Sequence, residues 1–236
     1  MKKITAAVGD IHGQYDALVE LQSEVERRYE SKGDIQWVFL GDYTDRGPKS
    51  AQVVDYLRAN EKWVKIKGNH DDMMARWDNN WIPNGGGTTL DSYGFKNFYY
   101  KDDGSHLPLE KQLIPMARLK RDMRWLATLP TMHEDEHRIY VHAGLYPGEN
   151  WRASSDYVKM WIRNEFLLTP HWYDGKLVVH GHTPYHSKDG NIQQMPWRVN
   201  ADTASCFGGH LTALIFVDDV REHIDAVQIA TPKRMN

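Results

Sequence analysis

Five apolar stretches of this sequence each end abruptly where glycine stands next to, or two residues from, aspartate, asparagine or histidine. The five junctions are residues 9–13 (GDIHG), 41–47 (GDYTDRG), 68–71 (GNHD), 142–144 (HAG) and 180–183 (HGHT). Glycine permits a tight turn and close backbone approach, and the ligand crevice of an open α/β sheet lies at the carboxyl ends of its strands. We therefore expect five loops that deliver oxygen and nitrogen donors to one edge of a sheet.

The first half of the chain alternates short apolar runs with amphipathic segments. Strands are predicted at residues 4–8, 35–40 and 63–66, and helices at residues 14–30, from Pro48 onward and at residues 70–77. In the first of these helices the apolar side chains recur at roughly helical spacing. This β-α-β-α-β-α order implies parallel strands that are joined by helical crossovers.

The second half is richer in strands. A helix is predicted at residues 118–128, a hairpin at 131–142, a helix at 154–168, and strands at 177–179, 192–194, 198–200, 211–217 and 223–229. Residues 78–114, between the two halves, hold many aromatics and show no clean periodicity, so we expect an insertion with irregular and short helical parts. No linker or repeat divides the chain, which favours a single domain over residues 1–236.

Charge and cysteine content narrow the classes of function. The net charge is −3, from 29 basic and 32 acidic residues, which predicts neither a nucleic-acid surface nor a polybasic membrane patch. No apolar run approaches the roughly 18–20 residues of a membrane span. The one cysteine, Cys206, excludes an internal disulfide and fits a reducing cytoplasm. We expect a cytoplasmic globular protein.

The five junctions together offer a mixed set of candidate metal ligands. These are two carboxylates, three imidazoles and one amide: Asp10, Asp42, His12, His142, His182 and Asn69. Carboxylate with imidazole suits manganese, iron or zinc in a catalytic site, and a carboxylate shared by two ions about 3.5–4 Å apart makes a dinuclear centre. Each junction alone is more often a plain turn or a structural histidine, but five in this order favour a metal site.

These motifs resemble a known family. Asp-x-His-Gly, Gly-Asp-x-x-Asp-Arg-Gly, Gly-Asn-His-Asp, His-Ala-Gly and Gly-His-Thr, in this order over residues 9–183, are similar to the motifs of the calcineurin-like metallophosphoesterases. The Asp-Arg-Gly element resembles more narrowly the phosphoprotein phosphatases of the compact bacterial and phage type. The resemblance implies an α/β fold with a central two-sheet β-sandwich, helices on both faces, and metals at the carboxyl ends of the strands.

The resemblance also implies how the ligands are shared. Asp10, His12 and Asp42 would hold the first metal. Asp42, Asn69, His142 and His182 would hold the second, so that Asp42 bridges the two. The cofactors would be two divalent ions, with Mn²⁺ the first choice and Fe or Zn the alternatives, and a bridging hydroxide would attack phosphorus.

Four further residues receive catalytic roles by the same resemblance. His70 would protonate the leaving group, Asp45 would orient that imidazole, and Arg46 would bind phosphate oxygens in a fork. Arg163, in Met-Trp-Ile-Arg-Asn, matches the second arginine of the family. An ordinary solvated helix arginine is the alternative reading of Arg163, and Arg152 is then the replacement.

The Asn-Gly-Gly loop that contains Asn84 resembles a loop of the bacterial branch, and Asn84 is expected to contact substrate. An ordinary glycine loop packed by tryptophan is the alternative. The aromatics around this loop could stack on a nucleobase, grip a peptide or form a satellite core; they are Trp77, Trp81, Tyr93, Phe95, Phe98, Tyr99 and Tyr100.

The function that we expect is metal-dependent hydrolysis of a phosphomonoester, with a serine/threonine phosphoprotein as the first choice of substrate. The alternative is a symmetrical dinucleoside (diadenosine) tetraphosphate hydrolase. A hypothesis of another class is a non-catalytic module that binds phosphorylated partners. That module would not need the acid or the arginine, yet His70 and Arg46 are both present.

Overall fold

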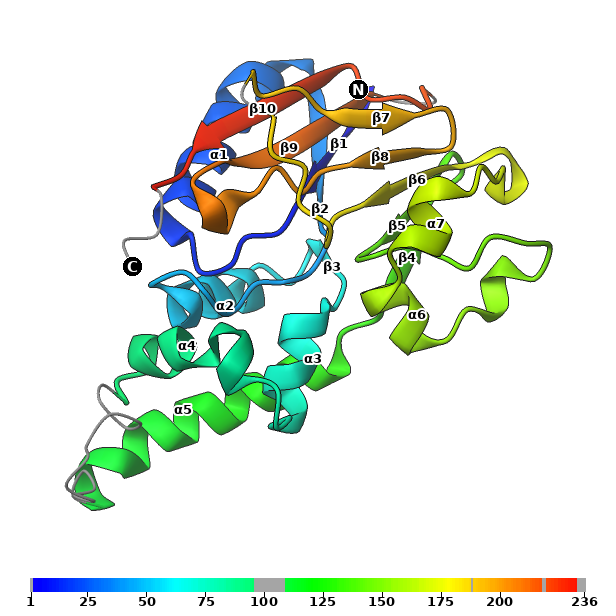
Figure 1. The fold of residues 1–236 in the computed structure, drawn as a ribbon. Coiled ribbons are helices and arrows are strands. Elements are labelled where there is room, and N and C mark those ends of the chain that lie inside the picture. Colours follow the sequence, from blue (N-terminus) through cyan, green and yellow to red (C-terminus); the bar gives the residue numbers. More distant parts are fainter. Residues whose placement is uncertain (1, 96–108, 188, 218–219, 233–236) are drawn as a thin grey trace.

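The protein is described here by a computed structural model that covers residues 2–95, 109–187, 189–217 and 220–232, with residues 109–114 described as backbone only. Within these residues ten strands form two five-stranded sheets (Figure 1). The first sheet has the order β10-β9-β1-β2-β3, with β1 Lys2–Val8, β2 Gly33–Phe39, β3 Val64–Lys65, β9 His210–Val217 and β10 Asp225–Ala230. The second has the order β4-β5-β6-β8-β7, with β4 Met132–Glu134, β5 Arg138–Val141, β6 Leu177–His180, β7 Gln193–Met195 and β8 Arg198–Asn200.

Both sheets have a parallel centre. Strands β1, β2 and β3 run parallel, and β9 and β10 continue the first sheet in antiparallel pairs. In the second sheet β5, β6 and β8 are parallel, while β4 and β7 form antiparallel edges. The predicted parallel first half and the partly antiparallel second half are therefore both present. The carboxyl ends of five parallel strands, β1, β2, β3, β5 and β6, lead directly into the five junctions.

The two sheets pack face to face through a shared apolar core. Ala7, Val38 and Leu40 of the first sheet's inner face belong to the same buried cluster as Tyr140 and Val179 of the second. The sequences of these parallel strands are nearly continuous apolar runs, because each strand is buried on both of its faces. The predicted two-sheet sandwich is confirmed.

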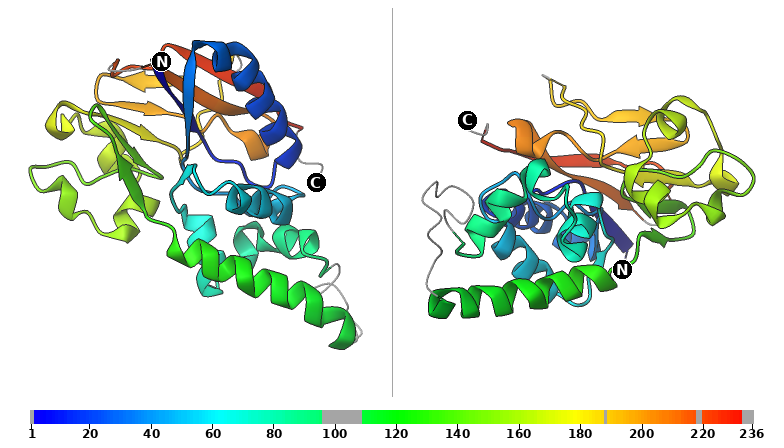
Figure 2. Two further views of the ribbon diagram at one scale, coloured as in Figure 1. Left: turned by 180° about the vertical axis from the view of Figure 1, so that it is seen from behind. Right: turned by 60° about the horizontal axis from the view of Figure 1, so that its bottom comes forward.

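Helices cover both outer faces, as predicted. A large core joins the first sheet to α1 Tyr15–Tyr29, α2 Ser50–Ala59, α3 Asn69–Arg76, α4 Gly87–Ser92 and α5 Leu109–Thr128. A smaller core joins the second sheet to α6 Asp156–Trp161 and α7 Asn164–Leu168. Figure 2 shows α5 as a long helix on the outer side of the helices that pack on the first sheet. Among the helices that the structure describes, none is long and apolar enough to cross a membrane.

Two helices differ from the prediction. The helix expected at residues 154–168 is broken into α6 and α7, because Ile162 takes an extended ψ of 143° and Arg163 leaves the helical region at φ −130°, ψ −96°. This break lets Ile162 and Phe166 both enter the smaller core. Helix α5 is longer than the predicted 118–128 and contains Pro115 within it.

Short helical turns connect the longer elements in the part of the chain that the structure describes. The segment after α3 forms a π-type turn, Ile82–Gly86, which leads directly into α4. Four 3₁₀ turns lie elsewhere, at Glu30–Lys32, Trp151–Ala153, Tyr173–Gly175 and Ser205–Phe207.

Candidate metal and phosphate site

The strand ends of the two sheets meet at one rim. The backbone N–H groups of Ile11 and His12, after β1, donate to the carbonyl of Asp42, after β2, at 3.1 and 2.8 Å. In the second sheet the N–H of Gly181 donates to the carbonyl of His142 at 2.8 Å. These backbone bonds fix neighbouring loops to each other, so the polar side chains that the loops carry converge.

One group of donor atoms joins Asp42, His142 and His182, whose candidate ligand atoms all lie within 4.8 Å of one another. His142 Nε2 lies 3.4 Å from Asp42 Oδ1 and 2.9 Å from Asn69 Oδ1. His182 Nδ1 lies 3.0 Å from the same Asn69 oxygen, while its buried Nε2 has no hydrogen-bond partner. Two imidazoles, a carboxylate and an amide oxygen gathered in one buried place fit a divalent ion.

A second group of donor atoms joins His12, Asp42 and His70 within the same limit of 4.8 Å. His12 Nδ1–H donates to the Thr44 carbonyl at 2.7 Å, which leaves Nε2 as the ligand atom, 3.4 Å from Asp42 Oδ2. His142 is oriented in the same way by a 2.8 Å bond from its Nδ1 to the Leu40 carbonyl. Such bonds set the tautomer of metal-binding histidines. Asp42 belongs to both groups, as expected for a bridging carboxylate.

Asp10 lies at the edge of this arrangement. Its two carboxylate oxygens both accept the backbone N–H of His182, at 3.2 Å each. The side chain is buried, and no other donor to these two oxygens is seen among the described residues. The group around His12 and Asp42 therefore contains His70 and not Asp10, although the Asp10 oxygens retain lone pairs that could bind a cation.

His70 and Asp45 form a buried pair. His70 Nδ1 donates to Asp45 Oδ2 at 2.7 Å, which leaves His70 Nε2 directed away from the carboxylate. The other oxygen, Asp45 Oδ1, accepts bonds of 2.8 Å from the Trp81 indole N–H and from the Thr89 hydroxyl. Sequence reasoning missed these two supporting residues. A tryptophan directly before the Asn-Gly-Gly loop was the one signal for them.

Arg46 spans the pair and the metal ligands. Its guanidinium donates from Nη1 to His12 Nε2 and from Nη2 to His70 Nε2, both at 2.8 Å. Its carbon Cζ lies 5.5 Å from the centroid of the Phe207 ring. A fork of five N–H donors at this place suits phosphate oxygens.

The remaining candidates differ in position. Arg163 is exposed and reaches the rim, where its Nη1 donates to the Thr183 hydroxyl at 2.9 Å. Asn84 is not brought to the ligands, because its amide donates to the Asn80 carbonyl at 2.8 Å within its own turn. The loop does reach the site through its backbone, since the Gly85 carbonyl accepts the N–H of Arg46 at 3.3 Å. Arg152 is paired with Asp174 and Glu134 instead.

The aromatics of the segment after α3 divide into two groups. Trp81, Tyr93 and Phe95 are buried in the core of the first sheet, so they cannot present a face to substrate. Trp77 is 45% exposed and contacts Trp81 edge to face. Phe98, Tyr99 and Tyr100 lie outside the described residues.

The backbone is strained at the site. Five of its non-glycine residues have positive φ: His12 45°, Asp42 53°, Asp45 71°, Arg46 67° and His182 67°. Such conformations cost free energy and persist where the surroundings enforce them, often at functional sites. Glycine supplies the remaining close approach, since a Cβ on Gly68 would lie 2.2 Å from Asp42 Oδ1.

Burial and neighbouring charges shift the pKa values of the ligands in different directions. Burial, and then Asp202, raises the pKa of Asp10 well above its ordinary value. Burial alone would raise the pKa of Asp42, but the charges of His142 and His70 hold it well below. Burial opposes the charge on His142, yet Asp42 raises that pKa to about 9. Burial and His142 together lower the pKa of His182 to about 2. Ionised Asp42 therefore favours positive charge beside it, which in the absence of a cation is the proton on His142.

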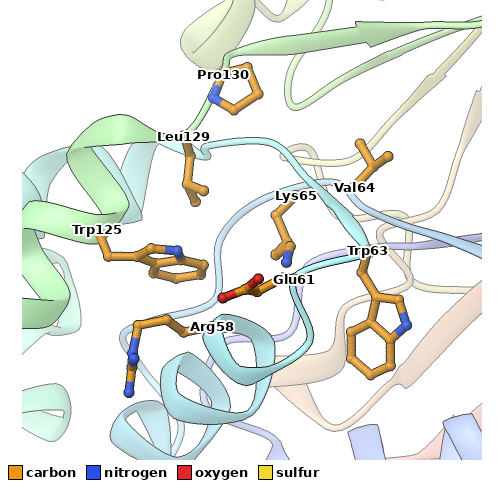
Figure 3. A pocket seen from close by; sticks show the side chains of 8 residues that line it. All are labelled: Arg58, Glu61, Trp63, Val64, Lys65, Trp125, Leu129 and Pro130. Carbon is orange, nitrogen blue, oxygen red and sulfur yellow. The ribbon is translucent and has the colours of Figure 1, made fainter.

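A pocket of about 570 Å³ lies away from this centre (Figure 3). It is lined by residues between the end of α2, β3 and the end of α5: Arg58, Glu61, Trp63, Val64, Lys65, Trp125, Leu129 and Pro130. Lys65 Nζ donates to the carbonyls of Leu57 and Asn60, at 3.2 and 2.6 Å, and so satisfies the end of α2. Lys65 thus has a structural role.

Comparison with known proteins gives one family. The model of the calcineurin-like phosphoesterases matches residues 5–213. The chain is 27% identical over 235 residues to an asymmetrical bis(5'-nucleosyl)-tetraphosphatase, PrpE, of Anoxybacillus flavithermus, with 88% of each chain covered. It is 29% identical over 174 residues to a symmetrical bis(5'-nucleosyl)-tetraphosphatase of Buchnera aphidicola, covering 72% of this chain and 53% of that protein. A crystal structure described as that of a proposed diadenosine tetraphosphatase has a TM-score of 0.61 at 20% identity, covering 97% and 93% of the two chains.

Proposed function

Because this chain belongs to the calcineurin-like phosphoesterase family, we propose that it hydrolyses dinucleoside tetraphosphates with two divalent metal ions, Mn²⁺ being the first choice. The substrate class is supported by one relative, the bis(5'-nucleosyl)-tetraphosphatase PrpE, whose alignment covers 88% of this chain. The observation that carries the chemistry is the pair of ligand groups that share Asp42. This substrate takes the place of the phosphoprotein that the motifs alone favoured.

The ligands of the first ion would be Asp10, His12 and Asp42, and those of the second Asp42, Asn69, His142 and His182. When bound there, divalent ions would polarise the phosphate and supply a nucleophile near neutral pH. The residues of this chain would perform the remaining tasks, which are to bind the phosphate, to orient it and to protonate the leaving group.

Arg46 would bind phosphate oxygens, because its guanidinium lies between His12 and His70 with two N–H directions. His70 would protonate the leaving oxygen through Nε2, while Asp45 holds the opposite nitrogen at 2.7 Å and stabilises the imidazolium. Arg163, at the rim beside Thr183, would bind the more distant phosphates of a longer chain.

A second candidate is the serine/threonine protein phosphatase, and the buried His70–Asp45 pair is the observation that favours it. A serine or threonine alkoxide is a poor leaving group that needs a proton, whereas a nucleotide leaves with little assistance. A complete general acid therefore suits a phosphoprotein at least as well as a dinucleotide.

The deciding experiment is a paired turnover assay with added Mn²⁺ on diadenosine tetraphosphate and on a phosphothreonine peptide, each with a metal-free control. A preference for the dinucleotide of more than about tenfold, equivalent to ~1.4 kcal/mol in transition-state binding, supports the proposal. The products then give the position of cleavage, since two ADP molecules mean symmetrical hydrolysis and ATP with AMP means asymmetrical hydrolysis. A tenfold preference for the peptide overturns the proposal in favour of the phosphatase. Bound metal with turnover of neither substrate would instead indicate the phosphate-binding module.

A further inference from the structure

Two places beside the metal ligands combine an arginine with an exposed aromatic side chain. The first is Arg46 with Phe207, whose ring is 50% exposed and lies 5.5 Å from the guanidinium carbon. Because Arg46 also donates to His12 Nε2 at 2.8 Å, this exposed ring stands directly next to the group formed by His12, Asp42 and His70.

The second pair is built on α6 and the break that follows it. The Trp161 ring lies 6.1 Å from the His182 ring, and Tyr157, 70% exposed, stacks on Trp161 at 6.1 Å with an angle of 19° between the planes. Arg163, just past the end of α6, donates to the Thr183 hydroxyl at 2.9 Å. An exposed aromatic surface and an arginine therefore stand together next to the group formed by Asp42, His142 and His182.

The two pairs reach the ligands that share Asp42 through different residues. Phe207 reaches the ligands through Arg46 and His12, whereas Trp161 reaches them through His182. Asp42 is the member that the two ligand groups have in common. A phosphate chain held across Asp42 would thus have an arginine and an aromatic surface near each of its two ends.

We propose that Phe207 and the stacked pair Tyr157–Trp161 are two nucleobase-binding platforms, one for each end of a dinucleoside polyphosphate. This inference rests on the proposed function and names the residues that select its substrate. Base–aromatic stacking tolerates any base, and its loss by alanine substitution weakens binding by about fivefold to a hundredfold per base. A phosphothreonine peptide carries no nucleobase, so it would leave both platforms without a base.

The location differs from the one that the sequence suggested for base binding. Of the aromatics around the Asn-Gly-Gly loop, Trp81, Tyr93 and Phe95 are buried. Phe207 and Tyr157 lie instead on segments that follow the strand ends of the second sheet, β8 and β5, and they are among the most exposed aromatics that the structure describes.

The test uses Phe207→Leu, Tyr157→Leu and the double variant, with Trp172→Leu as the matched control. Trp172 is 56% exposed and lies 5.6 Å from the Arg221 guanidinium, so it has the same kind of pairing, but it precedes the amino end of β6. Calorimetry with Mn²⁺ measures the binding of ADP and of inorganic diphosphate to each protein. The KM for diadenosine tetraphosphate is measured in parallel.

The double variant is expected to weaken ADP binding by about tenfold or more, to weaken diphosphate binding much less, and to raise the KM for the dinucleotide. Trp172→Leu should change none of these values. Equal losses for ADP and diphosphate, no change in ADP binding, or no binding of ADP by the unaltered protein would each overturn the platforms. A selective loss of ADP in a protein that does not hydrolyse the dinucleotide would support the platforms and refute the proposed function, so the two failures are distinguishable.

Discussion

The indole N–H of Trp81 donates a 2.8 Å hydrogen bond to Asp45 Oδ1, while Oδ2 of the same carboxylate accepts His70 Nδ1 at 2.7 Å. Trp81 is fully buried, and a Cβ on Gly86 would lie 2.8 Å from its ring. The Asn-Gly-Gly loop therefore holds Trp81 in hydrogen-bond contact with Asp45, the carboxylate that orients the proposed acid His70. The asparagine of the loop, Asn84, donates instead within its own turn.

Replacing Trp81 by Phe should lower turnover of a phosphothreonine peptide by about tenfold, because a hydrogen bond to a charged group is worth about 1.5–3 kcal/mol. Turnover of p-nitrophenyl phosphate should fall less, since its leaving group hardly needs the acid. The comparison of the two substrates measures the effect on His70 separately from any loss of stability.

Trp151→Phe is the matched control for Trp81→Phe. Trp151 is also buried and hydrogen-bonds a carboxylate, that of Asp174, but it belongs to the smaller core behind the second sheet. It should cost stability without changing the ratio of the two substrates. If both variants changed that ratio equally, Trp81 would have no specific role at Asp45.

Asp10→Asn should remove one of two bound ions and most of the activity. The Asp10 carboxylate is buried and receives the single N–H of His182 on both oxygens, so lone pairs remain for a cation. Native mass spectrometry counts the ions. Retention of both ions by this variant would exclude Asp10 as a ligand and leave the group of His12, Asp42 and His70 as the first site.

His70→Asn should keep both ions and lose turnover by about 100-fold or more on the phosphothreonine peptide, as expected for a general acid. Its Nδ1 is bonded to Asp45 at 2.7 Å, so only Nε2, 2.8 Å from Arg46 Nη2, is directed toward the site. Equal losses on the peptide and on p-nitrophenyl phosphate would contradict the role as acid, and a lost ion would make His70 a ligand.

Gly68→Ala should reduce stability by about 1–3 kcal/mol, as overpacking of a filled interior does, and should weaken metal binding. The new Cβ would lie 2.2 Å from Asp42 Oδ1 and 2.3 Å from the Asp42 backbone nitrogen. Denaturant unfolding and metal titration measure the two effects. Gly87→Ala is the control, because a Cβ there meets no atom within 4 Å and the residue is already helical. Its metal affinity should equal that of the unaltered protein.

Asp135→Asn should destabilise the protein near pH 7 by about 2 kcal/mol, since hydrogen bonds to a charged group are lost. The Asp135 carboxylate accepts the N–H groups of His137 and Arg138, at 2.9 and 2.8 Å, and the Tyr140 hydroxyl at 2.8 Å. Burial opposes its charge, but Arg138 and these bonds hold its pKa below the ordinary value.

The sign of the pH dependence follows from this lowered pKa. The stabilisation by Asp135 is fully present above the pKa of the unfolded chain, about 3.9, and disappears as the pH falls through the lower pKa of the folded state. Chemical unfolding at pH 7 and at pH 3 should therefore show a smaller difference between Asp135→Asn and the unaltered protein at the lower pH. A difference independent of pH would refute the assignment.

The strand ends could be predicted from the sequence because their signal is local. An apolar run that stops at glycine and a polar residue, as at Gly41-Asp42, marks the end of a buried strand. It also predicts that the polar side chain lies at the carboxyl edge of the sheet. The two-sheet arrangement depended on the order of these junctions and on their resemblance to a family.

Other features depend on contacts between distant segments, so the local sequence does not show them. Nothing near Ile162 indicates the break between α6 and α7, which arises because Ile162 and Phe166 must both enter one core. The bond from Trp81 to Asp45 joins residues 36 positions apart. Asn84 was assigned by motif, but its amide is used within its own turn.

The seam between the sheets carries one more consequence. Asp10 and His182, 172 positions apart, stand in contact there, each just beyond a strand of a different sheet. Ions bound at this seam would have ligands from both sheets and would therefore hold the two sheets together. They would raise the free energy of unfolding in proportion to the logarithm of the ion concentration. Removal of the metal would then stop the reaction and also lower the stability of the contact between the sheets. The melting temperature would therefore measure how much metal is bound, without any substrate.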